Sequence, residues 1–399
     1  MEEVISPAAT FEARPDAAPR TVVTARSAVR WFVWCLAAAV TFDAFGGYWD
    51  ISWHISIGRD TFWTPAHMMV YLAGILAGVA SGYTILATTF GSSNEYRDTA
   101  VSVWGFRGPL GCFVAAWGGL AMLTSAPFDN WWHAAYGLDV KILSLPHSIL
   151  GLGETMITLV TVILIVAHLN RASGSSRAKL DRLLLYVGGI VVFGSALLIL
   201  ESTPMEFMHS PSFYGAVARA FPIALIAISC VSSSRWPATV IAAIYTASFL
   251  AALWLFPLFA AEPKLGPVYQ PITHMVPLWF PVLLIVPAIA LDLLRRIVGE
   301  RWGRLTTGVV AGCVYLAAFV AAQWPFADFL LSPQARNPIF GTIYFGYFDP
   351  ANLTYDPYRF IAHGTSIQFL SGIAIALLSS IVFCCIGMAL GSWLKTVQR

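Results

Sequence analysis

Charged residues are scarce in this sequence, because Asp, Glu, Lys and Arg together make up 11% of its 399 residues. Soluble domains carry roughly a quarter, so the composition excludes an ordinary soluble protein. Hydrophobic residues make up 58%, and apolar runs long enough to cross a bilayer recur along the chain. We therefore predict an all-α, polytopic membrane protein embedded in the lipid bilayer.

The sequence also lacks CxxC cysteine pairs and any large excess of basic over acidic residues. The six cysteines all fall inside apolar runs and none has CxxC spacing, which argues against both a disulfide framework and a thiolate metal site. The formal net charge is +2, so we expect no nucleic-acid partner. Lys and Arg instead occur in short clusters between the apolar runs.

We predict about ten transmembrane helices after an Ala/Pro/Arg-rich, disordered cytoplasmic tail at residues 1–28. The predicted spans lie near 29–47, 65–90, 108–127, 146–168, 183–200, 213–231, 237–260, 275–294, 305–325 and 366–393. Basic residues concentrate in alternate connections and near both ends of the chain, which places both termini in the cytoplasm. All of the eight histidines except His168 then fall on the opposite face, which we assign to the periplasmic side of a bacterial inner membrane.

A motif of aspartate and histidine occurs twice, at Asp50–His67 and at Asp129–His147. Each copy reads D-x-x-W-H, followed by Gly four residues after the His, Asp six residues after it, and a Pro-containing turn into a second His. The first Asp and His are four residues apart and share one helix face. Gly favours the end of that helix, and Pro favours the start of the next. Each copy therefore predicts a helix corner that brings two imidazoles and one carboxylate together.

Two imidazoles and one carboxylate form a ligand set for copper, zinc or non-haem iron. The predicted metal ligands are Asp50, His54, His67, Asp129, His133 and His147. Further residues of the motif are predicted to orient the imidazoles or to exclude water: Asp60, Asp139, Trp53 and Trp132. The alternative is that these residues are solvated at the membrane interface, where Trp is common as an anchor.

The first copy resembles the C subunit of the particulate methane and ammonia monooxygenases, a family of copper membrane enzymes. The shared residues are the runs 58–61 and 64–67, preceded by Asp50 and His54. In that subunit an Asp-x3-His-x12-His set binds one copper, and an Asn-x3-His-x13-His set forms the neighbouring copper site. Both spacings occur here, with Asp129 in place of the Asn. The resemblance implies copper rather than zinc or iron, O2 with a small apolar substrate, and partner membrane subunits.

We divide the chain after the tail into a metal-binding helical bundle at 29–200 and an additional transmembrane bundle at 201–399. The resemblance covers roughly residues 30–200. The second bundle includes a long outer loop at about 326–364. At the start of the second bundle, three polar residues are predicted on the same face as the corners: Glu201, Glu206 and His209. They complete a site, line a substrate entrance or belong to a solvated loop.

Two functions agree with these patterns. The first is a copper-dependent monooxygenase, or a subunit of one, that hydroxylates an apolar substrate with O2 at the outer membrane face. The second is a copper-binding, copper-transporting or copper-loading protein without turnover. A structural subunit whose metal sites are inactive is a further alternative. Ligands clustered at one face favour the first, whereas Asp43 inside the first span is the residue that would indicate a path through the membrane. Partner subunits and a homo-oligomer are both left open.

Overall fold

The computed structural model describes residues 29–58, 60–92, 96–137, 144–264, 272–299, 301–345 and 365–398. These residues form eleven α-helices, short 3-10 helices and one two-stranded antiparallel hairpin, which confirms the predicted all-α class. The predicted tail and residues 346–364 of the predicted outer loop lie outside the described residues.

The helices are α1 (Trp31–Ser56), α2 (Pro65–Phe90), α3 (Leu110–Tyr136), α4 (Leu145–Arg171), α5 (Gly174–Ser195), α6 (Pro211–Ala220), α7 (Pro222–Val231), α8 (Pro237–Leu255), α9 (Ile285–Val298), α10 (Arg304–Leu330) and α11 (Ser366–Leu394). The hairpin pairs β1 (Ala100–Val103) with β2 (Phe106–Pro109). The 3-10 helices are η1 (Arg97–Thr99), η2 (Leu197–Ser202), η3 (Met205–Phe207), η4 (Phe256–Leu258), η5 (Pro333–Ala335) and η6 (Thr342–Phe345).

Eight segments within the described residues are long and apolar enough to cross a membrane. They are α1, α2, α3, α4, α6 with α7, α8 with η4, α10 and α11. The chain is therefore an integral membrane protein with multiple candidate spans, as its composition predicted.

Two of the ten predicted spans do not meet this measure. The span predicted at 183–200 overlaps α5, whose first turns carry Arg, Lys and Asp side chains and are too polar. The span predicted at 275–294 is helical only from Ile285 onward. Pro277 and Pro281 explain the difference, because proline lacks a backbone N–H and disfavours the helical conformation in the residue before it.

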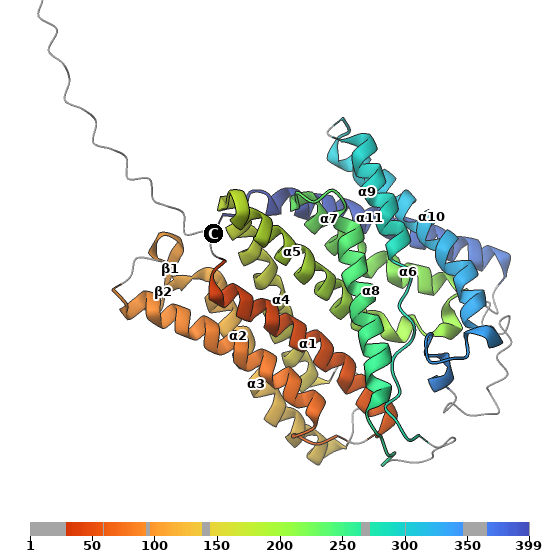
Figure 1. Ribbon diagram of the computed structural model, residues 1–399, viewed down its shortest axis with the longest axis horizontal. Coiled ribbons are helices and arrows are strands. Elements are labelled where there is room, and N and C mark those ends of the chain that lie inside the picture. The colour runs from red at the N-terminus through yellow and green to blue at the C-terminus, as the bar shows by residue number, and fades with distance from the viewer. Residues whose placement is uncertain are drawn as a thin grey trace, which may run out of the picture.

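Helices α1 to α4 pack as an antiparallel group that carries both predicted corners (Figure 1). The end of α1, the start of α2 and the end of α3 lie at the lower end of Figure 1, and the hairpin between α2 and α3 lies at the opposite end. The end of α11 also lies there, where Asn170 donates to the carbonyl oxygens of Leu394 and Val397 at 2.9 and 2.7 Å. The two corners thus share one end of the molecule, as the alternating topology predicts.

Glycines allow α2, α3 and α4 to approach closely. A Cβ added at Gly119 of α3 would lie 2.6 Å from the carbonyl oxygen of Gly74 on α2. A Cβ added at Gly153 of α4 would lie 2.6 Å from the carbonyl oxygen of Gly118. Small residues at helix contacts are the usual means of bringing backbones together inside a membrane, and here they hold the two corners side by side.

The second half of the chain holds the end of α1 through hydrogen bonds of two serine side chains and one backbone carbonyl. Ser52 donates to the carbonyl oxygen of Val276 at 2.6 Å, and the Val276 N–H donates to Ser56 at 2.7 Å. The N–H of Lys264 donates to the carbonyl oxygen of Ile57 at 2.8 Å. Ser52 and Ser56 are buried and each follows a predicted ligand by two residues, so they anchor the face of α1 that points away from Asp50 and His54.

Replacing Gly119 by alanine should destabilise the protein by about 1–3 kcal/mol, because the added methyl meets backbone atoms that cannot move aside easily. Gly82→Ala on α2 is the matched control, since a Cβ there meets no atom within 4 Å. Thermal unfolding of the detergent-solubilised variants measures both. Equal melting temperatures for the two variants would contradict the close packing of α2 and α3.

Candidate metal centre

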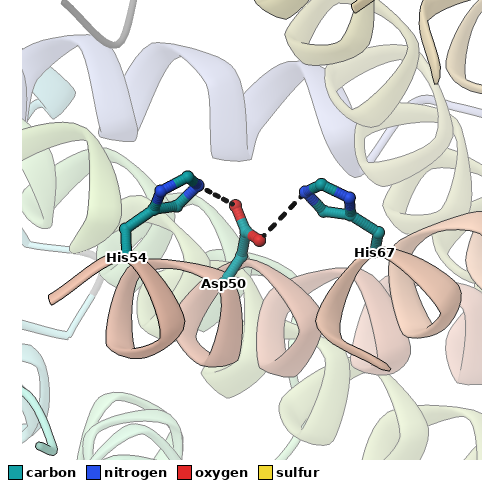
Figure 2. A group of neighbouring side chains, drawn as sticks. All are labelled: Asp50, His54 and His67. Atoms are coloured by element: carbon teal, nitrogen blue, oxygen red, sulfur yellow. Dashed lines mark ion pairs between the residues drawn. The ribbon is translucent and has the colours of Figure 1, made fainter. Parts of the chain in front are cut away.

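The first corner brings Asp50, His54 and His67 together as predicted. α1 ends at Ser56, and Gly58 adopts a φ of +82°, a left-handed conformation that reverses the chain with little strain. Pro65 then opens α2, which places His67 in its first turn. Figure 2 shows the Asp50 carboxylate between the two imidazoles. Its oxygens lie 3.6 Å from Nε2 of His54 and 3.1 Å from Nε2 of His67.

The second corner repeats this arrangement with Asp129, His133 and His147. α3 ends before Gly137, which has a φ of +87°, and α4 begins after Ser144, whose hydroxyl accepts a hydrogen bond from the His147 N–H. The Asp129 oxygens lie 3.3 Å from Nε2 of His133 and 3.4 Å from Nε2 of His147. In each corner, candidate ligand atoms from all three residues lie within 4.8 Å of one another.

Hydrogen bonds to the backbone determine which imidazole nitrogen faces the carboxylate. Nδ1 of His67 lies 2.9 Å from the carbonyl oxygen of Thr61, and Nδ1 of His133 lies 3.1 Å from that of Gly137. A carbonyl oxygen only accepts, so both Nδ1 atoms carry the proton. In a neutral ring Nε2 is then a bare lone pair directed at a carboxylate, and that contact is repulsive unless a cation, either a proton or a metal ion, lies between them.

The carboxylate oxygens that face these nitrogens fit the same conclusion. Oδ1 of Asp50 and Oδ1 of Asp129 are buried, and each faces an imidazole Nε2. A buried anionic oxygen without a donor is unfavourable unless a charge neutralises it. The rings remain accessible from one side, because the side chains of His54 and His147 are 40% and 32% exposed. The donor set and its open side both suit a bound metal ion.

Asp60 lies closer to the first corner than its predicted orienting role requires. Its Oδ2 lies 3.2 Å from Nε2 of His67 and 3.6 Å from Nε2 of His54, and its side chain is 6% exposed. Burial acts to raise the pKa of Asp60, but the hydrogen bond with His67 and the charges of the neighbouring imidazoles lower it to about 2. Asp60 is therefore an ionised carboxylate and a candidate fourth ligand beside Asp50.

The two corners open into one cavity of about 430 Å³. Asp60 and His67 of the first corner line it together with Asp129 and His133 of the second. Tyr71 of α2 lies between the corners, and its ring packs against that of Phe62 with centroids 5.2 Å apart. A molecule in this cavity would thus be in reach of both triads, with an aromatic wall on one side.

The remaining predicted site residues have other positions. Trp53 is partly buried next to His54, and Trp132 packs against Tyr136 with ring centroids 4.7 Å apart. Asp139 lies outside the described residues, as does the Glu206 side chain, while Glu201 is exposed in η2.

His209 belongs to neither triad. It is buried, its Nε2 lies 2.9 Å from an Asp328 oxygen, and its ring packs edge-on against Trp324 of α10. We therefore interpret His209 as part of a contact between the segment before α6 and α10.

Comparison of the chain with protein-family models, curated proteins and solved structures finds no match. The geometry of the two corners and the spacing of their residues therefore support the functional argument by themselves.

Removing one imidazole from each corner, as His54→Ala with His133→Ala, should abolish binding of added copper(II), because each triad loses one of its two nitrogen donors. The metal-to-protein ratio after dialysis measures this by elemental analysis. His274→Ala is the control, since His274 is exposed and bonds Thr273 rather than a corner. An unchanged ratio in the double variant would exclude the corners as the metal sites.

Asp60→Asn should weaken copper(II) binding at the first corner by about 10–100-fold, the usual cost of losing a group that neutralises or orients a ligand. The second corner should keep its affinity, so titration should change from two similar steps to two separated ones. Glu262→Gln is the control, because Glu262 is an exposed carboxylate that belongs to neither triad. Identical titrations for Asp60→Asn and wild type would show that Asp60 does not contribute to copper binding.

Proposed function

We propose that this chain is a copper-dependent membrane monooxygenase, or a subunit of one, that hydroxylates a small apolar substrate with O2. The observation that supports this best is the pair of Asp-His-His triads at one end of the helix bundle, with residues of both lining one cavity. Intramembrane and interfacial ionisable groups are costly, and they are retained mainly where they have a function.

Copper is the metal that we favour over zinc and iron. Each triad offers two imidazole nitrogens and a carboxylate oxygen, a set that accepts all three metals. The resemblance of both spacings to the copper sites of the particulate monooxygenases decides in favour of copper. The copper would supply the activation of O2, and every other contribution comes from the chain.

The contributions of the chain follow from its contacts. The backbone carbonyls of Thr61 and Gly137 hold one imidazole ring in each corner, those of His67 and His133, in one tautomer, so that Nε2 of these rings is ready to bind without rearrangement. The cavity lies in the size range of small-molecule sites, and Phe62, Tyr71 and Ala126 give it apolar surface. A small apolar substrate would reach the cavity from the lipid bilayer.

We place the corners on the periplasmic face of a bacterial inner membrane, following the bias of the basic residues. Partner membrane subunits or further copies of the chain would complete the assembly. The exposed apolar side chains of α2 and α3, such as Val79, Tyr83 and Leu120, provide surface for lipid or for such a partner.

One observation favours a second candidate, a copper carrier without turnover. Asp43 of α1 forms a side-chain hydrogen bond with Glu154 of α4, inside two candidate spans. A transporter needs polar groups along its path through the membrane, and this pair lies on the same helices as the corners.

Turnover separates the two candidates. The copper-loaded protein, supplied with a reductant, should consume O2 and hydroxylate a small apolar substrate such as a short alkane. Asp50→Ala should lower the rate by about 100-fold or more, because removing a group that acts directly at the reacting centre typically has this effect. Product analysis by mass spectrometry measures it. Copper flux into proteoliposomes without any product would instead identify a carrier.

A further inference from the structure

A pair of carboxyl groups lies inside the membrane-spanning part of the corner bundle. Asp43 is the thirteenth of the 26 residues of α1, and Glu154 is the tenth of the 27 residues of α4. Their side chains form a hydrogen bond with each other. Oδ1 of Asp43 is buried and has no hydrogen-bond partner, so the pair offers a free acceptor in an apolar setting.

A hydrogen bond between two carboxyl groups requires a proton on one of them, because a carboxylate oxygen only accepts. The charges that act on the pair among the described residues are acidic: each carboxyl acts on the other, and Asp50 acts on Glu154. Two ionised carboxylates in contact, without a cation and away from water, would be strongly unfavourable. The pair therefore holds one proton.

The helix spacing places this pair about two turns from both corners, on nearly the same faces of α1 and α4. Asp43 precedes Asp50 by seven residues on α1, and Glu154 follows His147 by seven residues on α4. Seven residues are about two helical turns, or roughly 10 Å, and they return to nearly the same helix face. Between His147 and Glu154, Gly151 carries no side chain, and a Cβ there would meet no atom within 4 Å. The intervening turn of α4 therefore leaves open space on this side.

We propose that Asp43 and Glu154 form a membrane-embedded proton-binding site that exchanges protons with the two metal corners. The pair takes up a second proton from one side and becomes two carboxylic acids. It then releases one proton toward the corners and returns to the state with one shared proton, so charge and atoms balance over the cycle. Delivery to the corners rests on the proposed function, whereas the binding of the proton does not.

A proton fits this pair better than copper does. Two carboxyl groups offer oxygen donors alone, which suit hard ions, whereas the reduced copper that carriers move prefers thiolate and thioether sulfur. A hard divalent ion such as Ca²⁺ takes six to eight oxygen ligands, and the pair provides at most four oxygens. The mutual hydrogen bond already uses two of them, one as the donor and one as the acceptor.

Infrared spectroscopy of the whole protein in lipid tests the proton directly. The wild type should show the carbonyl band of a protonated carboxylic acid, and this band should shift in D2O because the proton exchanges with water. Asp43→Asn and Glu154→Gln together should remove the band, each change alone should shift it because the remaining buried carboxyl loses its partner, and Glu262→Gln, which changes an exposed carboxylate, should leave it unchanged. A band that survives in the Asp43→Asn/Glu154→Gln double variant, or that never shifts in D2O, would overturn the proposal.

Coupling to the corners has its own readout, so that its failure differs from failure of the proposed function. Adding copper(II) sulfate should change the wild-type band, because positive charge at the corners favours loss of the proton, and the His54→Ala/His133→Ala variant should not respond. Both pair variants should bind copper as the wild type does. Lower copper content in them would overturn the proposal in favour of a metal site, and an unresponsive wild-type band would overturn the coupling.

Where the wild type oxidises its substrate, each pair variant should lower the rate by about 100-fold, the scale of a lost proton-transfer group, with unchanged copper content. Unchanged turnover in the pair variants would overturn proton delivery. Absence of turnover in the wild type would defeat the monooxygenase proposal alone, because the infrared measurements still decide whether the pair holds a proton that responds to the corners.

Discussion

The geometry of both corners depends on one hydrogen bond, from an imidazole Nδ1 to a backbone carbonyl oxygen. That bond is available because each helix ends at the corner and leaves carbonyl groups outside its own hydrogen-bond ladder. Thr61 supplies the carbonyl in the loop of the first corner, and Gly137 supplies it at the end of α3. In a neutral ring this bond leaves Nε2 as the free lone pair, so the corner offers that nitrogen to a cation, either a proton or a metal ion.

The charges around the cavity reinforce this constraint. Asp50, Asp60 and Asp129 place three carboxylates near four imidazoles. With neutral rings the cluster carries a formal charge of −3, and two divalent ions would bring it close to neutrality. Without metal the same groups collect protons instead, so metal binding here must release protons and depend on pH. A proton reservoir two turns deeper, at Asp43 and Glu154, would lie within reach of that exchange.

Local sequence rules predicted the corners well, because each determining feature acts over a few residues. The four-residue spacing puts Asp50 and His54 on one face, and Gly58 and Pro65 define where one helix ends and the next begins. The count of ten spans is less accurate, because the apolar run at 275–294 predicts a helix that Pro277 and Pro281 delay until Ile285. The closeness of Asp60 to both imidazoles depends on the path of a loop, which local rules do not determine. The pairing of Asp43 with Glu154 depends on how α1 packs against α4, although a glutamate seven residues after His147 in an apolar run was a visible signal.

The second half of the chain gives the first corner a support that the second corner does not receive from the described residues. Ser52 and Ser56 tie the last turns of α1 to Val276, on the helix face opposite the ligands, while α3 and α4 are held mainly by glycine contacts with their neighbours. The non-helical segment around Val276 therefore covers a face of α1 that would otherwise need lipid or a partner. The faces of α2 and α3 stay exposed and apolar, so a partner subunit of the kind proposed would meet the bundle on these two helices, which carry ligands of both corners.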